Sequence, residues 1–265
     1  MSRVKTLALA VAVLFALAGC AALFDFNLFG ALDNPPTPTA ADYQGADGRD
    51  KLGEDLTSPA MIEALIDSGL VDDIAADLLT FIGGSVGGDD DAEAAILYAD
   101  LALKTSEGEN LVNNIVETIL EGTITGSSTV ADILADIIPP EALASEATFT
   151  AMVDALLDAN DAYLLLGDYV DGSTSDGVAE NDLPTGSLPG DVAQKALVAY
   201  TMAVTVSEVM SDLGITEAEA ITQLYLVATG DPTYNPAMDT VTPDPYAAPD
   251  NGILALLDLA GVSIP

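Results

Sequence analysis

Carboxylates are the main reactive side chains of this sequence. It contains 43 Asp and Glu residues, a single cysteine and no histidine. Without histidine, the commonest general base and the usual zinc ligand are missing, and no Ser-His-Asp or Cys-His nucleophilic system can be assembled within the chain. The sequence also lacks a phosphate-binding loop and a dinucleotide fingerprint. The chemistry that remains is acid–base catalysis by paired carboxylates, or the binding of a hard cation.

Calcium is the cation that carboxylate oxygens favour. The acidic loop at 171–182 resembles an EF-hand loop in its first three ligand positions, but it lacks the central glycine and ends in aspartate instead of glutamate. Carboxylates in and beside this loop could still form an irregular calcium site: Asp168, Asp171, Asp176, Glu180 and Asp182. The alternative is an acidic loop that is solvated and binds no ion.

The chain begins with basic residues, followed by a short apolar run and then by small residues. This order is typical of a cleavable export signal. Arg3 and Lys5 precede an apolar run at 6–19, which is shorter than the roughly 20 residues needed to span a membrane. The run leads into Leu17-Ala18-Gly19-Cys20, which resembles the lipobox of bacterial lipoproteins. The resemblance implies that residues 1–19 are a signal peptide and that Cys20 carries a diacylglycerol anchor.

The same resemblance implies a protein of the cell envelope, held in a membrane by its N-terminal lipid and facing the periplasm or the cell surface. Ala21 follows the lipidated position, and in enterobacterial lipoproteins the lack of aspartate there implies sorting to the outer membrane. Because Cys20 is the only cysteine, no internal disulfide can form.

The chain is extremely acidic, with a formal net charge of −37 and six basic residues. Such a surface makes nucleic acids and anionic lipid head groups poor partners. One interpretation is adaptation to high salt, because molar salt shortens the screening length to roughly 3 Å. The other is a binding surface for cations or for a basic protein. Basic residues are scarce along the whole sequence and not in one patch, which favours the salt adaptation of a halophile.

Composition divides the mature chain into a tether and a helical domain. Residues 20–57 are expected to be a flexible tether, because a proline-rich stretch at 34–39 favours extended backbone and a polar, glycine-containing stretch follows. From 58 to 265 apolar residues recur with the helical period, and no segment alternates as a strand would. We therefore expect an all-α fold, an irregular bundle or short array of about eight or nine antiparallel helices.

Local signals place the helices. They are expected after Ser58 up to about residue 82, and at 89–105, 109–121, 130–138, 148–170, 191–212, 216–229 and 253–259. The stretch at 196–206 carries no charge on any face, so its helix should be buried at the centre, packed on helix 148–170. The hairpin at 91–121 weakly resembles a tetratricopeptide-type unit, although no fixed repeat period follows it.

A few polar residues interrupt the apolar helices: Asn160, Lys195, Thr201, Thr205 and Glu208. They could line an interior cleft. The alternative is that they form hydrogen bonds within the core or lie at helix ends, as buried polar groups usually do.

Three functions compete. The leading hypothesis is a non-enzymatic, lipid-anchored envelope protein whose helical domain scaffolds or binds a protein partner. The alternative is a periplasmic solute-binding component that works with a transporter, as some spirochaete lipoproteins with tetratricopeptide-like helices do. The third is a hydrolase that uses two acids. An apolar groove would favour the first, a deep pocket with convergent polar groups the second, and two carboxylates facing each other in a cleft the third.

The charge predicts that stability depends on salt. A net charge of −37 makes the folded state repel itself, and screening relieves that repulsion. We expect the melting temperature to rise steadily as sodium chloride is raised from low concentration to about molar, followed by circular dichroism. A melting temperature that stays flat over this range would argue that the acids serve to bind a partner instead.

Overall fold

The computed structural model describes residues 37–121, 134, 137–172, 174–241 and 250–262. Within them the chain forms nine α-helices, three short 3-10 helices and no strand, which confirms the expected all-α class. The chain divides into two compact units at Thr37, and the helices belong to the second, Pro38–Pro265. The signal peptide, Cys20 and most of the helix expected at 130–138 lie outside the described residues.

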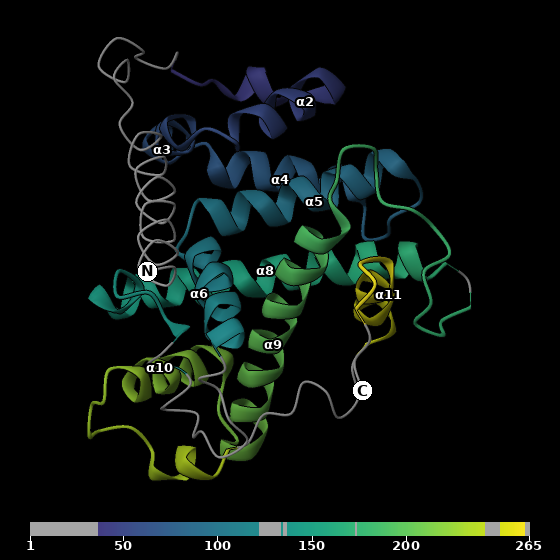
Figure 1. Ribbon diagram of the computed structural model, residues 1–265. Coiled ribbons are helices and arrows are strands. Elements are labelled where there is room, and N and C mark those ends of the chain that lie inside the picture. The colour runs from purple at the N-terminus through teal and green to yellow at the C-terminus, as the bar shows by residue number, and fades with distance from the viewer. Residues whose placement is uncertain (1–36, 122–133, 135–136, 173, 242–249, 263–265) are drawn as a thin grey trace, which may run out of the picture. The chain divides into compact units, whose positions relative to one another are not determined.

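The helices from η1 to α6 follow one another with short connections, whereas a long loop joins α8 to α9 (Figure 1). In chain order they are η1 (Ala40–Tyr43), α2 (Gly45–Asp55), α3 (Pro59–Ser68), α4 (Val71–Ile82), α5 (Asp89–Lys104), α6 (Gly108–Glu121), η2 (Ala142–Ala144), α8 (Glu146–Asp171), α9 (Pro189–Leu213), α10 (Glu217–Ala228), η3 (Pro236–Thr240) and α11 (Asn251–Leu259).

Most helix ends lie where the sequence signals place them. Pro59 occupies the first turn of α3, where its missing N–H costs nothing. Gly69 and Gly83 end α3 and α4 in the left-handed region, with φ of 70° and 63°. Thr216 and Glu219 form the capping box that opens α10.

Helix α8 is the centre of the described unit. It contacts α5, α6, α9, α10 and α11, and Figure 1 shows α9 crossing it. Its apolar side chains are fully buried along most of its length: Phe149, Met152, Val153, Leu156, Tyr163, Leu166 and Val170. A helix with this many neighbours loses nearly all of its apolar surface to the core.

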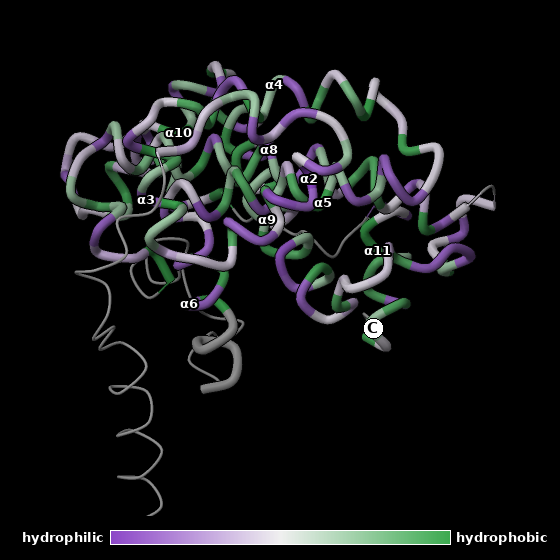
Figure 2. Tube along the Cα trace, turned by 90° about the horizontal axis from the view of Figure 1, so that it is seen from above, coloured by the Kyte–Doolittle hydropathy of each residue, from purple (hydrophilic) through white to green (hydrophobic). Residues whose placement is uncertain are grey.

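The expectation that α9 would be the central helix is wrong, although its packing on α8 is as predicted. Val198 and Met202 are buried, but Leu197, Thr201 and Thr205 of the same stretch are only partly buried. Among the described helices, α9 is long and apolar enough to cross a membrane by length and composition. Contacts with α8 and α11 account for part of its apolar surface. In Figure 2 hydrophobic residues recur along α8 and α9, and hydrophilic residues recur in outlying turns.

The structure also corrects the boundary of the predicted tether. Residues 40–55, which the sequence places in a flexible segment, form η1 and α2 and belong to the folded unit. Tyr43, Leu52 and Leu56 are buried in the core. The Tyr43 hydroxyl donates to Asp55 at 2.8 Å, and Lys104 of α5 donates to the Leu56 carbonyl at 3.1 Å. The apolar residues of this segment are too widely spaced for their helical pattern to stand out in the sequence.

Two glycines allow α8 and α11 to touch backbone to backbone. A Cβ on Gly167 would lie 2.5 to 2.6 Å from main-chain atoms of Gly252, closer than any real contact. A methyl group at this point would have to push α11 away from the core.

Gly167→Ala should therefore destabilise the fold by about 2 kcal/mol or more, which lowers the melting temperature by roughly 4–8 °C in a domain of this size. Gly190→Ala in the first turn of α9 is the control, because a Cβ there meets nothing within 4 Å. Thermal melts at fixed salt compare the two variants. Equal melting temperatures would show that α11 does not depend on this contact.

Candidate functional site

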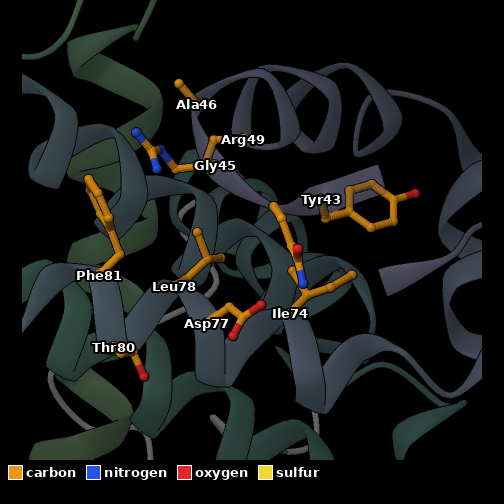
Figure 3. Close-up of a pocket in the computed structure, with 10 residues that line it drawn as sticks. Tyr43, Gly45, Ala46, Arg49, Ile74, Asp77, Leu78, Thr80 and Phe81 are labelled. Atoms are coloured by element: carbon orange, nitrogen blue, oxygen red, sulfur yellow. The ribbon is translucent and has the colours of Figure 1, made fainter. Parts of the chain in front are cut away.

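A groove opens between the η1–α2 segment and α4 (Figure 3). Its volume is about 610 Å³, within the range typical of ligand sites. Both walls contribute side chains: Tyr43, Gln44, Gly45, Ala46 and Arg49 from one, and Ile74, Asp77, Leu78, Thr80 and Phe81 from the other. We call this site the α2–α4 groove.

The turn from η1 into α2 places the first wall. Gly45 has φ of 72° at the junction of η1 and α2, a backbone conformation that glycine adopts without steric cost. Gly48 packs directly against the Tyr43 backbone, where a Cβ would have no room. This close approach brings Arg49 of α2 towards α4.

Arg49 has an unusual environment for a cation in so acidic a chain. Its guanidinium carbon lies 3.9 Å from the centre of the Phe81 ring, within the range of a cation–π interaction. The residue is only 9% exposed, and its buried Nε has no hydrogen-bond partner. In the part of the chain that the structure describes, Arg49 forms no ion pair, whereas Lys51, Lys104 and Lys195 all pair with aspartates.

The outer side of α4 carries both acidic and apolar side chains, with Asp73 and Asp77 exposed beside two large apolar residues. Ile74, Leu78 and Ile82 are buried in the core, but Leu79 and Phe81 remain 45% and 43% exposed. The groove therefore combines an apolar wall that water reaches with one guanidinium that no carboxylate neutralises.

A second hollow, of about 320 Å³, lies among α4, α5 and α8. Burial raises the pKa of Asp154, and burial together with the charges of Asp154 and Asp161 raises the pKa of Asp158. Burial and the neighbouring Asp158 raise the pKa of Tyr98 to about 12. Asp154 and Asp158 stand one turn apart on the same helix, so they are neighbours on one face and do not oppose each other. This is not the arrangement expected for a pair of hydrolytic acids.

The carboxylates of the predicted calcium site lie in the last turn of α8 and in the loop that follows it. Among the described residues, no three His, Cys, Asp or Glu side chains are arranged to hold a metal ion. Asp171 is buried and accepts a 2.7 Å hydrogen bond from the Gly177 amide. Asp176 accepts one from the Val178 amide. Both carboxylates therefore stabilise the loop through hydrogen bonds from its own amides.

Asp168 lies near the end of α8, and Glu180 and Asp182 lie in the loop that follows it. Burial raises the pKa of Asp168, and the nearby Asp250 and Asp171 add to the shift. The Glu180 amide donates to the Val170 carbonyl at 2.8 Å, so the loop returns along the end of α8. The loop is thus held by backbone contacts and by Asp171.

Three of the five polar residues expected in a cleft have partners elsewhere: Thr201, Thr205 and Lys195. Thr201 and Thr205 donate to carbonyls of their own helix at 2.8 Å, and Glu208 is exposed. Asn160 is buried, and its Oδ1 has no partner among the described residues. Lys195 is 6% exposed, and its Nζ binds Asp100 at 2.8 Å and Asp191 at 2.9 Å. Hydrogen bonds and ion pairs to other groups thus account for Thr201, Thr205 and Lys195.

The Lys195 ion pair links α9 to α5. Burial alone would lower the pKa of Lys195, but the carboxylates of Asp100 and Asp191 outweigh burial and raise it above its ordinary value. The lysine is therefore charged throughout the neutral range, and its loss would leave Asp100 largely unpaired.

Lys195→Met should cost about 2 to 3 kcal/mol of stability, because breaking a buried ion pair strands the remaining charge. The loss is reduced because Lys104 stays 3.9 Å from Asp100. The double variant Lys195→Met with Asp100→Leu should recover most of it, since it removes both charges. Urea unfolding at fixed salt measures both. If the double variant were no more stable than the single one, the unpaired carboxylate of Asp100 would not be the cause of the lost stability.

Arg49 and Phe81 were not among the site residues predicted from the sequence. Arg49 fell in the predicted tether, and the one available signal was that it is among the few cations of an acidic chain. Its contact with Phe81 joins two helices and has no local signature. No family model, curated protein or solved structure matches this chain.

Proposed function

We propose that this protein is a lipid-anchored component of a cell envelope, adapted to high salt, whose non-enzymatic helical domain binds a protein partner in the α2–α4 groove. The observation that carries the proposal is the exposed apolar wall of the groove, formed by Phe81 beside the buried Ile74 and Leu78. Exposed apolar patches next to a concave surface mark interaction sites.

The composition of the groove supports a protein partner. The centres of protein interfaces are enriched in aromatic residues and arginine, and they are depleted of lysine and carboxylates. The groove offers Tyr43, Phe81 and Arg49, and among its lining residues Asp77 is the acid. In a chain with 43 acids, such a patch is a place where a partner meets little charge repulsion.

The anchor is supported by the sequence. Cys20 follows a basic, apolar and small-residue segment that resembles a lipoprotein signal, and it is the only thiol. Residues 20–36 would then connect the lipid to the folded unit, which begins at Pro38. The anchor places the groove on a domain that stays at the membrane.

A solute-binding component associated with a transporter is the second candidate. It is favoured by the polar groups that line the same groove, namely Gln44, Arg49, Asp77 and Thr80. A hydrolase receives less support, because Asp154 and Asp158 lie side by side on α8 and not across a cleft.

The lipid anchor predicts the behaviour of Cys20→Ala. The variant should accumulate as an uncut precursor or leave the membrane fraction, because neither cleavage nor lipidation can occur. Fractionation followed by intact-mass spectrometry measures this. An unmodified Cys20 in membrane-bound wild-type protein would contradict the proposal.

The groove is tested with a photo-reactive amino acid at Thr80 in the full-length protein in its native membranes at high salt. We expect a cross-linked partner that is lost in Phe81→Ser, because the serine removes the apolar contact. Val178→Ser is the matched control, since Val178 is 51% exposed and lies outside the groove. A cross-link that survives Phe81→Ser would argue against the groove. A low-mass adduct in place of a protein would favour the solute-binding candidate.

A further inference from the structure

The charges around Arg49 point to a ligand that carries a negative charge. The chain has 43 acidic and six basic residues, so an arginine has many carboxylates available to it. The three described lysines use them. Arg49 does not, although Asp77 lines the same groove. A charge that is mostly withdrawn from water is stable only when it is paired and hydrogen-bonded.

The contact with Phe81 gives the Arg49 guanidinium neither an opposite charge nor a hydrogen-bond acceptor. A cation over an aromatic ring is attracted by the electrons of the ring, but a phenyl ring is a poor substitute for an oxygen that accepts a hydrogen bond. The Nε of Arg49 is buried and has no acceptor. Its two Nη atoms are not closed off in this way, and they are the atoms that a carboxylate in the groove can reach. Figure 3 shows the guanidinium beside Phe81 at one end of the groove, with Leu78 and Ile74 along its floor.

We propose that the α2–α4 groove binds the C-terminal carboxylate of a partner polypeptide, paired with Arg49, while an apolar C-terminal side chain lies against Phe81 and Leu78. The proposal rests on the binding role proposed above for this groove and names its ligand chemistry. A guanidinium and a carboxylate match in geometry and form two parallel hydrogen bonds.

The charge of the site selects a single carboxylate. One guanidinium balances one negative charge, and Asp77 together with the net charge of −37 disfavours a phosphate or any other dianion. The apolar floor requires that the carboxylate stand next to an apolar group. The terminal residue of a polypeptide with an apolar side chain has both features on one carbon atom.

The open form of the groove favours a polypeptide over a free acid. Small ligands bind tightly when a pocket encloses most of their surface. This groove is open along α4, where the lining residues Asp77, Thr80 and Phe81 are exposed, so an extended chain can continue beyond the terminal residue. The surrounding acids would attract basic residues upstream in that chain.

The test uses the full-length lipidated protein in detergent at fixed high salt. Hexapeptides that end in Leu, Val or Phe are titrated by calorimetry, each as the free acid and as the C-terminal amide. We expect the free acid of at least one peptide to bind, and its amide to bind roughly tenfold more weakly or worse, because the amide loses a charge-assisted pair. In Arg49→Met the acid and amide should bind equally.

Lys51→Met is the matched control, because it removes the same charge from the same helix and Lys51 does not line the groove. Its ammonium lies 5.0 Å from the centre of the Tyr43 ring, so the comparison uses the ratio of acid to amide affinity and not the affinity itself. Lys51→Met should leave the preference for the acid unchanged. Arg49→Lys keeps the charge without the planar fork, and it should reduce the preference even if Arg49→Met fails to fold, as judged by thermal melts.

Three results would overturn the proposal: no binding of any free-acid peptide, equal binding of acid and amide by the wild type, or hexanoate binding as tightly as the best peptide. The last would assign the site to small carboxylic acids. A Phe81-dependent cross-link that persists when the peptides fail would leave the groove as a protein-binding site and reject only the carboxylate.

Discussion

The packing around α8 is the constraint on which the rest of the unit depends. Its side chains are buried on most of its faces, and α5, α6, α9, α10 and α11 all rest on it. Each of these helices buries apolar side chains against α8. The contact between α8 and α11 is so close that both helices have a glycine at that point, Gly167 and Gly252. Once α8 is surrounded, the other helices have little freedom in position.

This core explains how so acidic a chain can fold. About half of its residues are apolar, and long helices such as α8 and α9 bury them on inner faces while aspartates remain outside. The few cations are used where helices meet. Lys195 joins α9 to α5, and Lys104 joins α5 to the end of α2. The charge then acts mainly on the surface, where salt can screen it.

The groove arises because α2 joins this core from one side only. Tyr43 and Leu52 are buried, and Tyr43 is fixed by its hydrogen bond to Asp55. The rest of α2 faces α4 across an open space, with Arg49 bridging to Phe81. Residues 40–55, which the sequence analysis assigned to a flexible tether, thus form one wall of the candidate site.

The sequence by itself determined the all-α class and most helix ends, because those depend on neighbouring residues. Pro59, Gly69 and the Thr216–Glu219 capping box act through the backbone within one turn. The tertiary structure alone decided that α8 is central and that α2 is folded. It also decided that Lys195 meets Asp100, 95 residues away, and that Arg49 meets Phe81. Such contacts depend on which apolar stripes pack together, and many pairings of stripes satisfy the same sequence pattern.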